Sequence, residues 1–328
     1  MTKLINLNEK IKKNNFLVIG RAGIDIYPDP PGSKIEKVKK FISFLGGSSA
    51  NIAVQLRKLG CNCKILTRVS NDSVGKFVIN ELRKNNIDNT LVKVEGGESR
   101  TSVAIVESTI KDHQTVIYRN QAADLFMNQK DIINAKIKNF SCIIFTGTCL
   151  ASEPSRSAIF LALKIANKNN IPVIQDIDYR PYTWKSPKEA SKVYLKAAKL
   201  SNILIGNDVE FGVLAMNYNK GLSLAKNLSK KVNIVIYKKG EKGSITFENN
   251  KKISKGIYKV KALKPTGAGD AFMGGLIGSI ANNYSLNNSI EIGSAAAAIV
   301  VTKVGCSPAM PNMKEIKNFM KKNRIRKV

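Results

Sequence analysis

Short apolar runs alternate with amphipathic segments along most of this chain. The apolar runs have the length and composition of buried strands; they are residues 16–20, 64–69, 142–146, 173–176, 203–206 and 233–237. The segments between them have the spacing of surface helices; they are residues 49–59, 74–85, 155–169, 189–200 and 222–229. Strands that alternate with helices predict an α/β fold with a mainly parallel sheet that is covered on both faces.

Two segments interrupt this alternation, residues 23–44 and 98–119. Within the second, Thr101–Glu107 and Thr115–Arg119 are strand-like and are separated by turn-forming residues. Both segments predict hairpins outside the main sheet, either as a cover over a site or as ordinary decoration. The chain shows no internal repeat and no long linker rich in Pro, Gly or Ser, so we expect residues 1–328 to form a single domain.

Length and composition favour a globular protein with a large core. The chain has 328 residues, of which 43% are hydrophobic. Its apolar runs are shorter than the roughly 18 residues that a membrane-spanning helix needs. Residues 1–15 are polar and rich in Lys and Asn, without the apolar centre of a signal peptide. We therefore expect a cytoplasmic protein with no membrane partner.

The formal net charge of +29 suggests at first a nucleic-acid partner. The lysines, however, are spread over every segment and interleaved with Asn, with clusters such as residues 37–40, 230–231, 251–252 and 321–327. These clusters contain no interleaved aromatic residues, and no DNA- or RNA-reading motif is recognisable. A solvated Lys-rich surface is the better explanation, and its charge would attract anionic ligands.

The cysteines and the single histidine exclude several kinds of chemistry. The five cysteines are an odd number, which favours reduced thiols; they are Cys61, Cys63, Cys142, Cys149 and Cys306. The pair Cys61-x-Cys63 has no second pair at zinc spacing, and His113 is the only histidine of the sequence. A structural zinc and a Ser-His-Asp mechanism are therefore not expected.

The segment Lys264-Pro265-Thr266-Gly267-Ala268-Gly269-Asp270 is the clearest candidate for a reactive site. It lies between a β-like run, Ile257–Leu263, and an apolar helix pattern, Ala271–Ile280. Its glycines allow the backbone N–H groups to converge on an anion at a helix N-terminus. A carboxylate beside such an anion hole is suited to accept a proton from a hydroxyl during phosphoryl transfer. The alternative is an ordinary glycine-rich helix start with an acidic first turn.

A second glycine motif lies far upstream, at Gly46-Gly47-Ser48-Ser49-Ala50-Asn51, and opens an amphipathic segment that ends at Gly60. Paired glycines let a ligand approach the backbone, and the Asn51 amide offers a donor and an acceptor to a polyol. In this order and at this separation, the two motifs resemble the two signatures of the PfkB carbohydrate kinases, the ribokinase-like family. The resemblance extends from about residue 17 to about residue 311.

The resemblance implies a three-layer α/β/α fold, with residues 23–44 and 98–119 as a small β lid over the sugar site. It also implies ATP-dependent phosphorylation of a hydroxyl group, with Mg²⁺ as the metal. Asp270 would be the base, and the backbone of Gly267, Ala268 and Gly269 would hold the transferring phosphoryl group. A homodimer formed through the lid would fit the family. No P-loop is present, and Gly20-x-x-Gly23-x-Asp25 is not the dinucleotide-binding pattern.

On the sugar side, the resemblance implies contacts from Asp25, Gly46, Gly47 and Asn51. Asp25 follows the first predicted strand, where a carboxylate can accept hydrogen bonds from two sugar hydroxyls. The alternative for Asp25 is a turn-capping role.

On the nucleotide side, the resemblance implies ATP contacts from Asn207, Lys239, Gly240, Gly243, Thr266, Gly267, Gly269, Ala298 and Gly305. Asn207-x-x-Glu210 matches the family pattern that organises Mg²⁺ and its waters, so Glu210 would act on the metal through water. Glu210 also has the alternative of an ordinary acidic residue in a helix first turn. The Ala295–Ala298 run is equally typical of a tightly packed helix.

The segment from Asp176 to Trp184 places an arginine, two aspartates and three aromatic residues after a strand. Arg180 can bind a carboxylate with two parallel hydrogen bonds, or it can pair with Asp176 or Asp178 as a structural ion pair. Together with residues 20–28 and 118–120, this segment is similar to the sugar-acid kinases of the family, and Arg119 would assist Arg180. The similarity implies phosphorylation of the terminal hydroxyl of 5-dehydro-2-deoxy-D-gluconate in inositol catabolism.

Other substrates stay open at this point. The family's kinases for 2-dehydro-3-deoxygluconate have a comparable arginine-and-tryptophan stretch, and neutral-sugar or nucleoside kinases share the fold. An inactive protein that binds nucleic acid is suggested only by the charge.

Lys264-Pro265 departs from the family, which often has an acidic residue and a threonine there, beside a bound monovalent cation. The Lys264 ammonium would either replace that cation or point into solvent. Because an ammonium group and a potassium ion close together in this loop would repel each other, we do not expect the protein to depend on potassium.

Overall fold

The computed structural model describes residues 2–326 and contains two β-sheets. The large sheet has the strand order β13-β12-β11-β10-β9-β8-β1-β4-β5. In that order, its strands are Lys251–Lys255, Ser244–Glu248, Ile234–Lys238, Ile203–Asn207, Val173–Asp176, Cys142–Thr146, Asn15–Ile19, Asn62–Ser70 and Asp88–Glu95. Pairing is parallel from β11 to β5, and β12 and β13 extend the sheet antiparallel at one edge. The predicted parallel sheet is confirmed.

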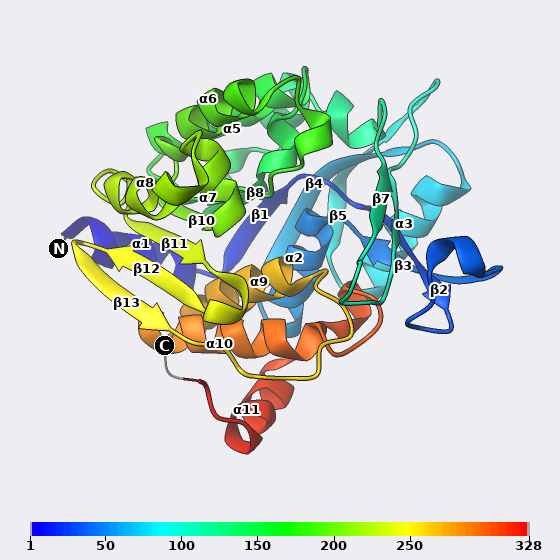
Figure 1. Ribbon diagram of the computed structural model, residues 1–328. Coiled ribbons are helices and arrows are strands. Elements are labelled where there is room, and N and C mark those ends of the chain that lie inside the picture. Colours follow the sequence, from blue (N-terminus) through cyan, green and yellow to red (C-terminus); the bar gives the residue numbers. More distant parts are fainter. Residues whose placement is uncertain (1, 327–328) are drawn as a thin grey trace.

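Helices cover both faces of the large sheet (Figure 1). One face packs against α1 (Thr2–Lys12), α2 (Ser48–Lys58), α3 (Ser73–Lys84), α9 (Ala268–Ala281) and α10 (Leu286–Val300), and α11 (Met313–Lys322) packs on α10. The other packs against α4 (Gln129–Asn134), α5 (Ser155–Lys168), α6 (Pro187–Ala198), α7 (Asp208–Leu214) and α8 (Gly221–Leu228). Successive strand residues such as Phe16 and Leu17 enter different cores, because side chains alternate across a strand. The result is the three-layer α/β/α arrangement that the sequence predicted.

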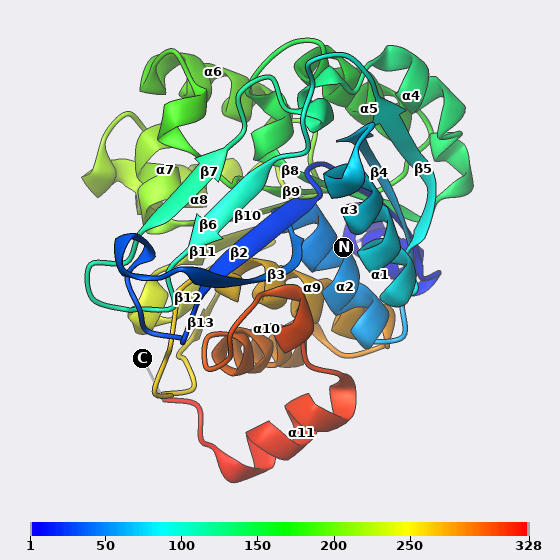
Figure 2. The same ribbon diagram turned by 90° about the vertical axis from the view of Figure 1, so that its right-hand side faces the viewer.

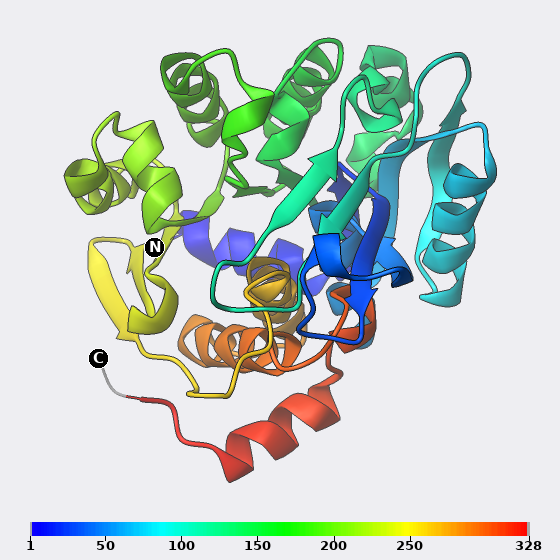
Figure 3. The same cartoon turned by 45° about the vertical axis from the view of Figure 1, so that its right-hand side comes forward.

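The small sheet has the order β3-β2-β6-β7 and lies beside the carboxyl ends of the central strands (Figures 2 and 3). Its strands are Lys40–Gly46, Gly23–Asp29, Val103–Val106 and Thr115–Tyr118. The two segments that interrupted the α/β alternation therefore meet in one sheet, because β2 pairs parallel with β6 across the intervening helices and strands.

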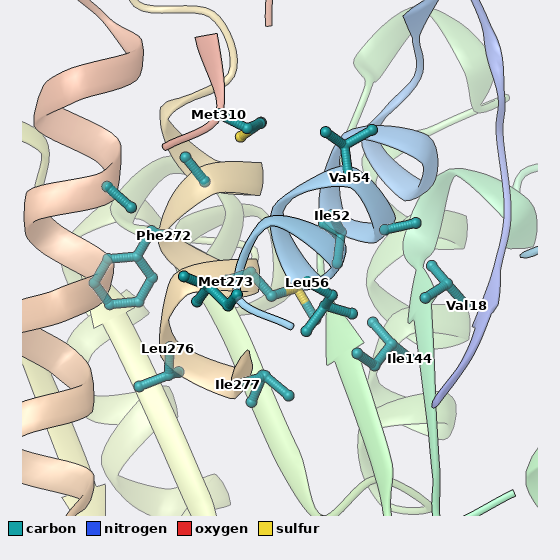
Figure 4. Close-up of a cluster of buried hydrophobic side chains, with 14 of the residues drawn as sticks. Val18, Ile52, Val54, Leu56, Ile144, Phe272, Met273, Leu276, Ile277 and Met310 are labelled. Atoms are coloured by element: carbon teal, nitrogen blue, oxygen red, sulfur yellow. The ribbon is translucent and has the colours of Figure 1, made fainter. Parts of the chain in front are cut away.

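Helices α2 and α9 form the centre of one core. Ile52 and Leu56 of α2 lie near Met273 and Ile277 of α9 (Figure 4). The helices approach closely at Gly274, where a Cβ atom would lie only 2.5 Å from Cβ of Gln55. The hydrophobic burial at this contact fixes how the N-termini of α2 and α9 lie relative to each other. Both glycine motifs include those N-termini.

Most predicted elements differ from the observed ones by a residue or two at their ends. One prediction is wrong: Ile257–Leu263 is not a strand but an extended connection, in which Tyr258 forms one isolated bridge to Ile325. The backbone N–H of Leu263 instead donates to the carbonyl of Val301 at the end of α10. The strand in this region is β13, which is Lys-rich and lacks an apolar pattern because it lies at the sheet edge.

Within residues 2–326, no helix has both the length and the apolar character that crossing a bilayer requires. All five cysteines are free and buried.

Candidate active site

Asp270 lies in the first turn of α9, directly after the glycine loop. Gly267 is the N-cap residue with φ +85°, a left-handed conformation that glycine adopts without strain. A Cβ atom at Gly267 would also lie 2.7 Å from Sγ of Cys306. The loop is only partly buried, so its N–H groups and the helix N-terminus face an accessible space.

A hydrogen bond joins the two glycine motifs. Asn51 Nδ2 donates to Asp270 Oδ2 at 2.8 Å, across 219 positions of sequence. Asn51 lies in the first turn of α2 and is buried, so the packing of α2 against α9 holds this pair in place. The amide orients the carboxylate, and its own oxygen has no partner among the described residues, which leaves it free for a ligand hydroxyl.

The surroundings of Asp270 tune its acidity. Burial, and to a lesser degree the nearby Asp178 carboxylate, raise the pKa of Asp270, whereas Asn51, Arg180 and Lys238 act in the opposite direction; the net pKa is about 7. A carboxyl group with a pKa near neutrality is suited to accept a proton from a hydroxyl.

Lys238 points to the anion loop, which the sequence analysis did not anticipate. It ends β11, and a Cβ atom placed on Gly269 would lie 3.3 Å from Lys238 Nζ. Its charge also acts on Asp176 and Glu210. An ammonium at this position can neutralise a phosphate at the N-terminus of α9. The only signal in the sequence was a lysine at the end of a predicted strand.

Asn207 and Glu210 form the capping box of α7. Asn207 Oδ1 accepts from the Glu210 N–H at 2.9 Å, and Glu210 Oε2 accepts from the Asn207 N–H at 2.7 Å. Glu210 Oε1 also accepts from the N–H of Tyr179 at 3.1 Å. The helix-start alternative for Glu210 is therefore realised, and its role on a metal stays a prediction.

Several carboxylates gather at the carboxyl ends of β9 and β10. Burial raises the pKa of Asp176 and of Glu210, and the neighbouring Asp178 carboxylate raises both further; Glu210 also raises the pKa of Asp176. The described residues contain no cluster of three or more side chains that would hold a metal directly. Carboxylates that repel each other without a direct cage fit a hydrated Mg²⁺ that is bound through waters and phosphates.

On the sugar side, Asp25 of β2 is buried beside the second glycine motif. A Cβ atom at Gly46 would lie 1.9 Å from Asp25 Oδ1, so only glycine fits there. Gly47 is the N-cap residue of α2. Burial raises the pKa of Asp25, which suits a carboxyl group that is stabilised by ligand hydroxyls.

A narrow cleft lies next to these residues. Its lining includes the three arginines Arg21, Arg119 and Arg180, together with Ser48, Ile117, Thr148, Asp178, Tyr182 and Thr183. Arg180 is half-exposed, with 46% of its side chain accessible, and its Nη2 lies 2.9 Å from Asp178 Oδ1. Asp178 raises the pKa of Arg180, so this guanidinium stays charged.

Arg119 makes several hydrogen bonds within the protein that the sequence did not predict. Its Nε and Nη2 both donate to Asp124, and its Nη1 donates to the carbonyl of Thr148. A guanidinium has five N–H donors, so it retains donors for a ligand. Arg119 lines the cleft as expected, but the Asp124 carboxylate already balances its charge.

Lys264 is fully buried, so its ammonium group does not point into solvent. Its Nζ donates to the carbonyl of Thr266 at 2.6 Å and lies 3.8 Å from Sγ of Cys306. The ammonium therefore lies directly behind the anion loop.

The remaining residues that were predicted to contact ATP lie in two parts of the structure, the turn after β11 and the region of α10. Lys239, Gly240 and Gly243 form the turn after β11, next to Lys238, with positive φ at both glycines. Ala298 is buried in α10, and Gly305 packs against Pro308 and Phe44. These packing contacts give Ala298 and Gly305 structural roles, and their contact with adenine stays a prediction.

Comparison with known proteins agrees with this geometry. The family model described as pfkB family carbohydrate kinase matches residues 13–313. A 5-dehydro-2-deoxygluconokinase from Photobacterium profundum is 36% identical over 93% of this chain and 94% of its own length. One with the same name from Geobacillus kaustophilus is 33% identical over 95% of both chains.

Solved structures share the fold. Vibrio cholerae fructokinase with fructose, ADP and calcium has a TM-score of 0.82 at 24% identity, and 94% of this chain and 99% of that chain are covered. A putative ribokinase II from E. coli with ATP and Mg²⁺ has a TM-score of 0.83 at 21% identity, with the same coverage. From the matched family model, the relatives and the site geometry, we conclude that this chain belongs to the pfkB family of carbohydrate kinases.

Proposed function

We propose that this protein transfers the γ-phosphoryl group of ATP to the terminal hydroxyl of 5-dehydro-2-deoxy-D-gluconate, giving the 6-phosphate and ADP. The observation that supports this most directly is the hydrogen bond from Asn51 to Asp270 at the anion loop, next to a cleft lined by three arginines. The names of the relatives that match almost the whole chain point to the same substrate.

In this reaction, Asp270 accepts the proton of the C6 hydroxyl as the O6–Pγ bond forms. The bond between Pγ and the bridging oxygen breaks, and ADP leaves. The N–H groups of Gly267, Ala268 and Gly269, together with Lys238, stabilise the charge on the phosphoryl oxygens. Asn51 keeps the Asp270 carboxylate oriented toward the hydroxyl.

We propose that ATP lies along Asn207, Thr266 and the turn after β11, which presents Lys239, Gly240 and Gly243. Ala298 and Gly305 would lie on the adenine side. Mg²⁺ would neutralise the phosphates, and Asp176 and Glu210 would hold it through its waters. These two acids are buried near each other and near Lys238, which is the charge distribution that a hydrated cation would balance.

The sugar acid would bind between Asp25, Gly46 and Gly47 on one side and Arg119 and Arg180 on the other. We propose that the small sheet formed by β3, β2, β6 and β7 is a lid within a single kinase domain of residues 1–328, excluding water during the transfer. Its apolar exposed residues, Phe41, Ile42, Val116 and Tyr118, would suit contact with a second copy of the chain.

Release of ADP, measured by a coupled assay over a panel of sugars and sugar acids, tests this function. The highest kcat/KM is expected for 5-dehydro-2-deoxy-D-gluconate. A higher kcat/KM for 2-dehydro-3-deoxygluconate would show that this sugar acid is the substrate instead. A higher value for ribose, fructose or adenosine would overturn the sugar-acid assignment altogether.

The net charge of +29 is the only feature that favours a nucleic-acid-binding function. A DNA-binding assay at several salt concentrations separates the two functions, because weak attraction that disappears near physiological salt is expected of any basic surface.

A further inference from the structure

The three arginines of the cleft differ in how their charge is balanced. Arg119 donates twice to Asp124 and once to a backbone carbonyl, and Arg180 pairs with Asp178 at 2.9 Å. Each of these two guanidinium groups therefore has a carboxylate of the protein in direct contact. Arg21 has no such contact among the residues that the structure describes.

Arg21 is buried, with 9% of its side chain exposed. Its Nε donates to Ser102 Oγ at 2.9 Å, which fixes the plane of the guanidinium. Its Nη2 is buried and makes no hydrogen bond within residues 2–326. An unsatisfied buried donor on a charged group is costly, so it indicates a partner that arrives with a ligand.

Asp25 is the nearest protein carboxylate, and it does not satisfy Arg21. Arg21 Nη2 lies 3.8 Å from Asp25 Oδ1, which is beyond the range of a hydrogen bond. Burial raises the pKa of Asp25 even though Arg21 acts to lower it, so a salt bridge does not dominate the environment of that carboxyl group. Asp25 remains available for hydroxyl groups, and Arg21 remains available for an acceptor.

The backbone of Arg21 is held rigidly against the second glycine motif. The Ala50 N–H donates to the Arg21 carbonyl at 3.3 Å, and a Cβ atom at Gly47 would lie 2.4 Å from that carbonyl oxygen. The side chain is anchored at the other end by Ser102, at the start of β6. Arg21 therefore connects the large sheet to the small sheet, and its terminal N–H groups line the cleft between the two sheets.

We infer that Arg21 is a specificity-determining residue, whose terminal N–H groups bind the carboxylate of the sugar acid. This inference rests on the proposed function. A planar guanidinium with free Nη donors matches a carboxylate, which accepts two parallel hydrogen bonds. The carboxylate and the phosphorylated hydroxyl are at opposite ends of the substrate chain, and Asp270 is not among the residues that line this cleft. Arg180 lines the same cleft and would contact the same carboxylate.

The test compares two substrates in three proteins. The substrates are 5-dehydro-2-deoxy-D-gluconate and its C1 carboxamide, which has the same shape but no charge. The proteins are the unmodified enzyme, Arg21→Gln and Arg57→Gln. Arg57 is the matched control, because it lies in the last turn of α2 and bonds Cys61 O and Asn62. The quantity of interest is the ratio of kcat/KM for the acid to kcat/KM for the amide.

The ratio is expected to fall roughly 10- to 100-fold in Arg21→Gln, the usual range for a lost charge-assisted hydrogen bond, and to stay unchanged in Arg57→Gln. KM for ATP is expected to stay within about twofold, which a general loss of structure would not allow. Arg21→Lys keeps the charge but loses the planar fork, so an intermediate fall is expected.

An unchanged ratio in Arg21→Gln overturns the inference. If Arg21→Gln does not fold, Arg21→Lys decides in the same way, since an unchanged ratio there excludes recognition by the guanidinium fork. If the unmodified enzyme itself shows no preference for the acid over the amide, the proposed sugar-acid function has failed, and that outcome is visible without any variant.

Discussion

The imidazole of His113 lies 3.3 Å from the hydroxyl of Thr266, and so joins the hairpin of the small sheet to the anion loop. His113 lies between β6 and β7, and its Nε2 is also 2.9 Å from Thr115 Oγ1. Glu107 holds the same hairpin, because its carboxylate accepts from Lys34 Nζ at 3.0 Å and from the Gln114 N–H at 3.2 Å. The hairpin of the small sheet therefore contacts the loop that would bind phosphate.

His113→Ala is expected to raise KM for the sugar substrate about 2- to 10-fold, the usual worth of one neutral hydrogen bond, with little effect on folding. Burial lowers the pKa of His113 below 6.5, so the neutral ring should make this contact at pH 7. Below its lowered pKa, the ring gains a charge near Lys264 and the contact should weaken. Steady-state kinetics at pH 7.5 check the first point; equal KM values for variant and parent would show that the contact does not hold the substrate.

Asp270→Asn is expected to lower kcat by on the order of 10²–10⁴, which is the usual contribution of general-base catalysis. The amide keeps the shape of the side chain but cannot accept the proton. Binding of ATP, measured by calorimetry or fluorescence, should change little. Near-normal kcat in this variant would remove Asp270 from the mechanism.

The pH dependence of kcat/KM should report the same residue. Because the pKa of Asp270 is raised to about 7, a base at this position is half ionised near neutrality, and kcat/KM should rise with pH and level off above about 8. The sign for stability is opposite. A carboxyl group whose folded pKa is raised destabilises the fold as pH increases from its unfolded value of about 4 through 7. Thermal denaturation should therefore show that Asp270→Asn is more stable relative to the parent at pH 8 than at pH 5.

Arg180→Ala is expected to raise KM for the sugar acid at least tenfold while KM for ATP stays nearly constant. The half-exposed guanidinium faces the cleft, and its loss leaves Asp178 buried without its partner. Arg180→Lys serves as a companion variant that keeps a positive charge next to Asp178. Parallel increases in both KM values would indicate a structural rather than a recognition role.

Activity is expected not to depend on potassium. Lys264 places a fixed ammonium group behind the anion loop, and a second cation in the same poorly solvated loop would be repelled. Rates in Tris, sodium and potassium buffers at constant ionic strength should agree within about twofold, with ionic strength held fixed because exposed charges are screened by salt. A several-fold rise specific to potassium would show that Lys264 does not take the place of an ion. Lys264→Met, of similar length, should lower kcat by weakening the loop.

The sequence by itself determined the succession of elements and the location of the reactive loops. Strand and helix periodicity are local properties, so Cys142–Thr146 and Val173–Asp176 were predicted with their observed bounds. The glycines at positions 46, 47, 267 and 269 are also local signals, since they mark places where the backbone needs freedom before a helix. The edge strand β13 escaped prediction because it has few buried side chains and therefore no apolar pattern.

The tertiary structure alone decided which side chains meet and which are already engaged. Packing of α2 on α9 brings Asn51 to Asp270, and no local pattern encodes a contact over 219 positions. The side chain of Lys264 is buried in the interior. Arg119 donates hydrogen bonds to Asp124, which leaves it fewer donors for a ligand. Arg21 received no such partner within the described residues. These outcomes depend on distances between elements: Arg180 Nη2 lies 2.9 Å from Asp178 Oδ1, within hydrogen-bond range, whereas Arg21 Nη2 lies 3.8 Å from Asp25 Oδ1, beyond it.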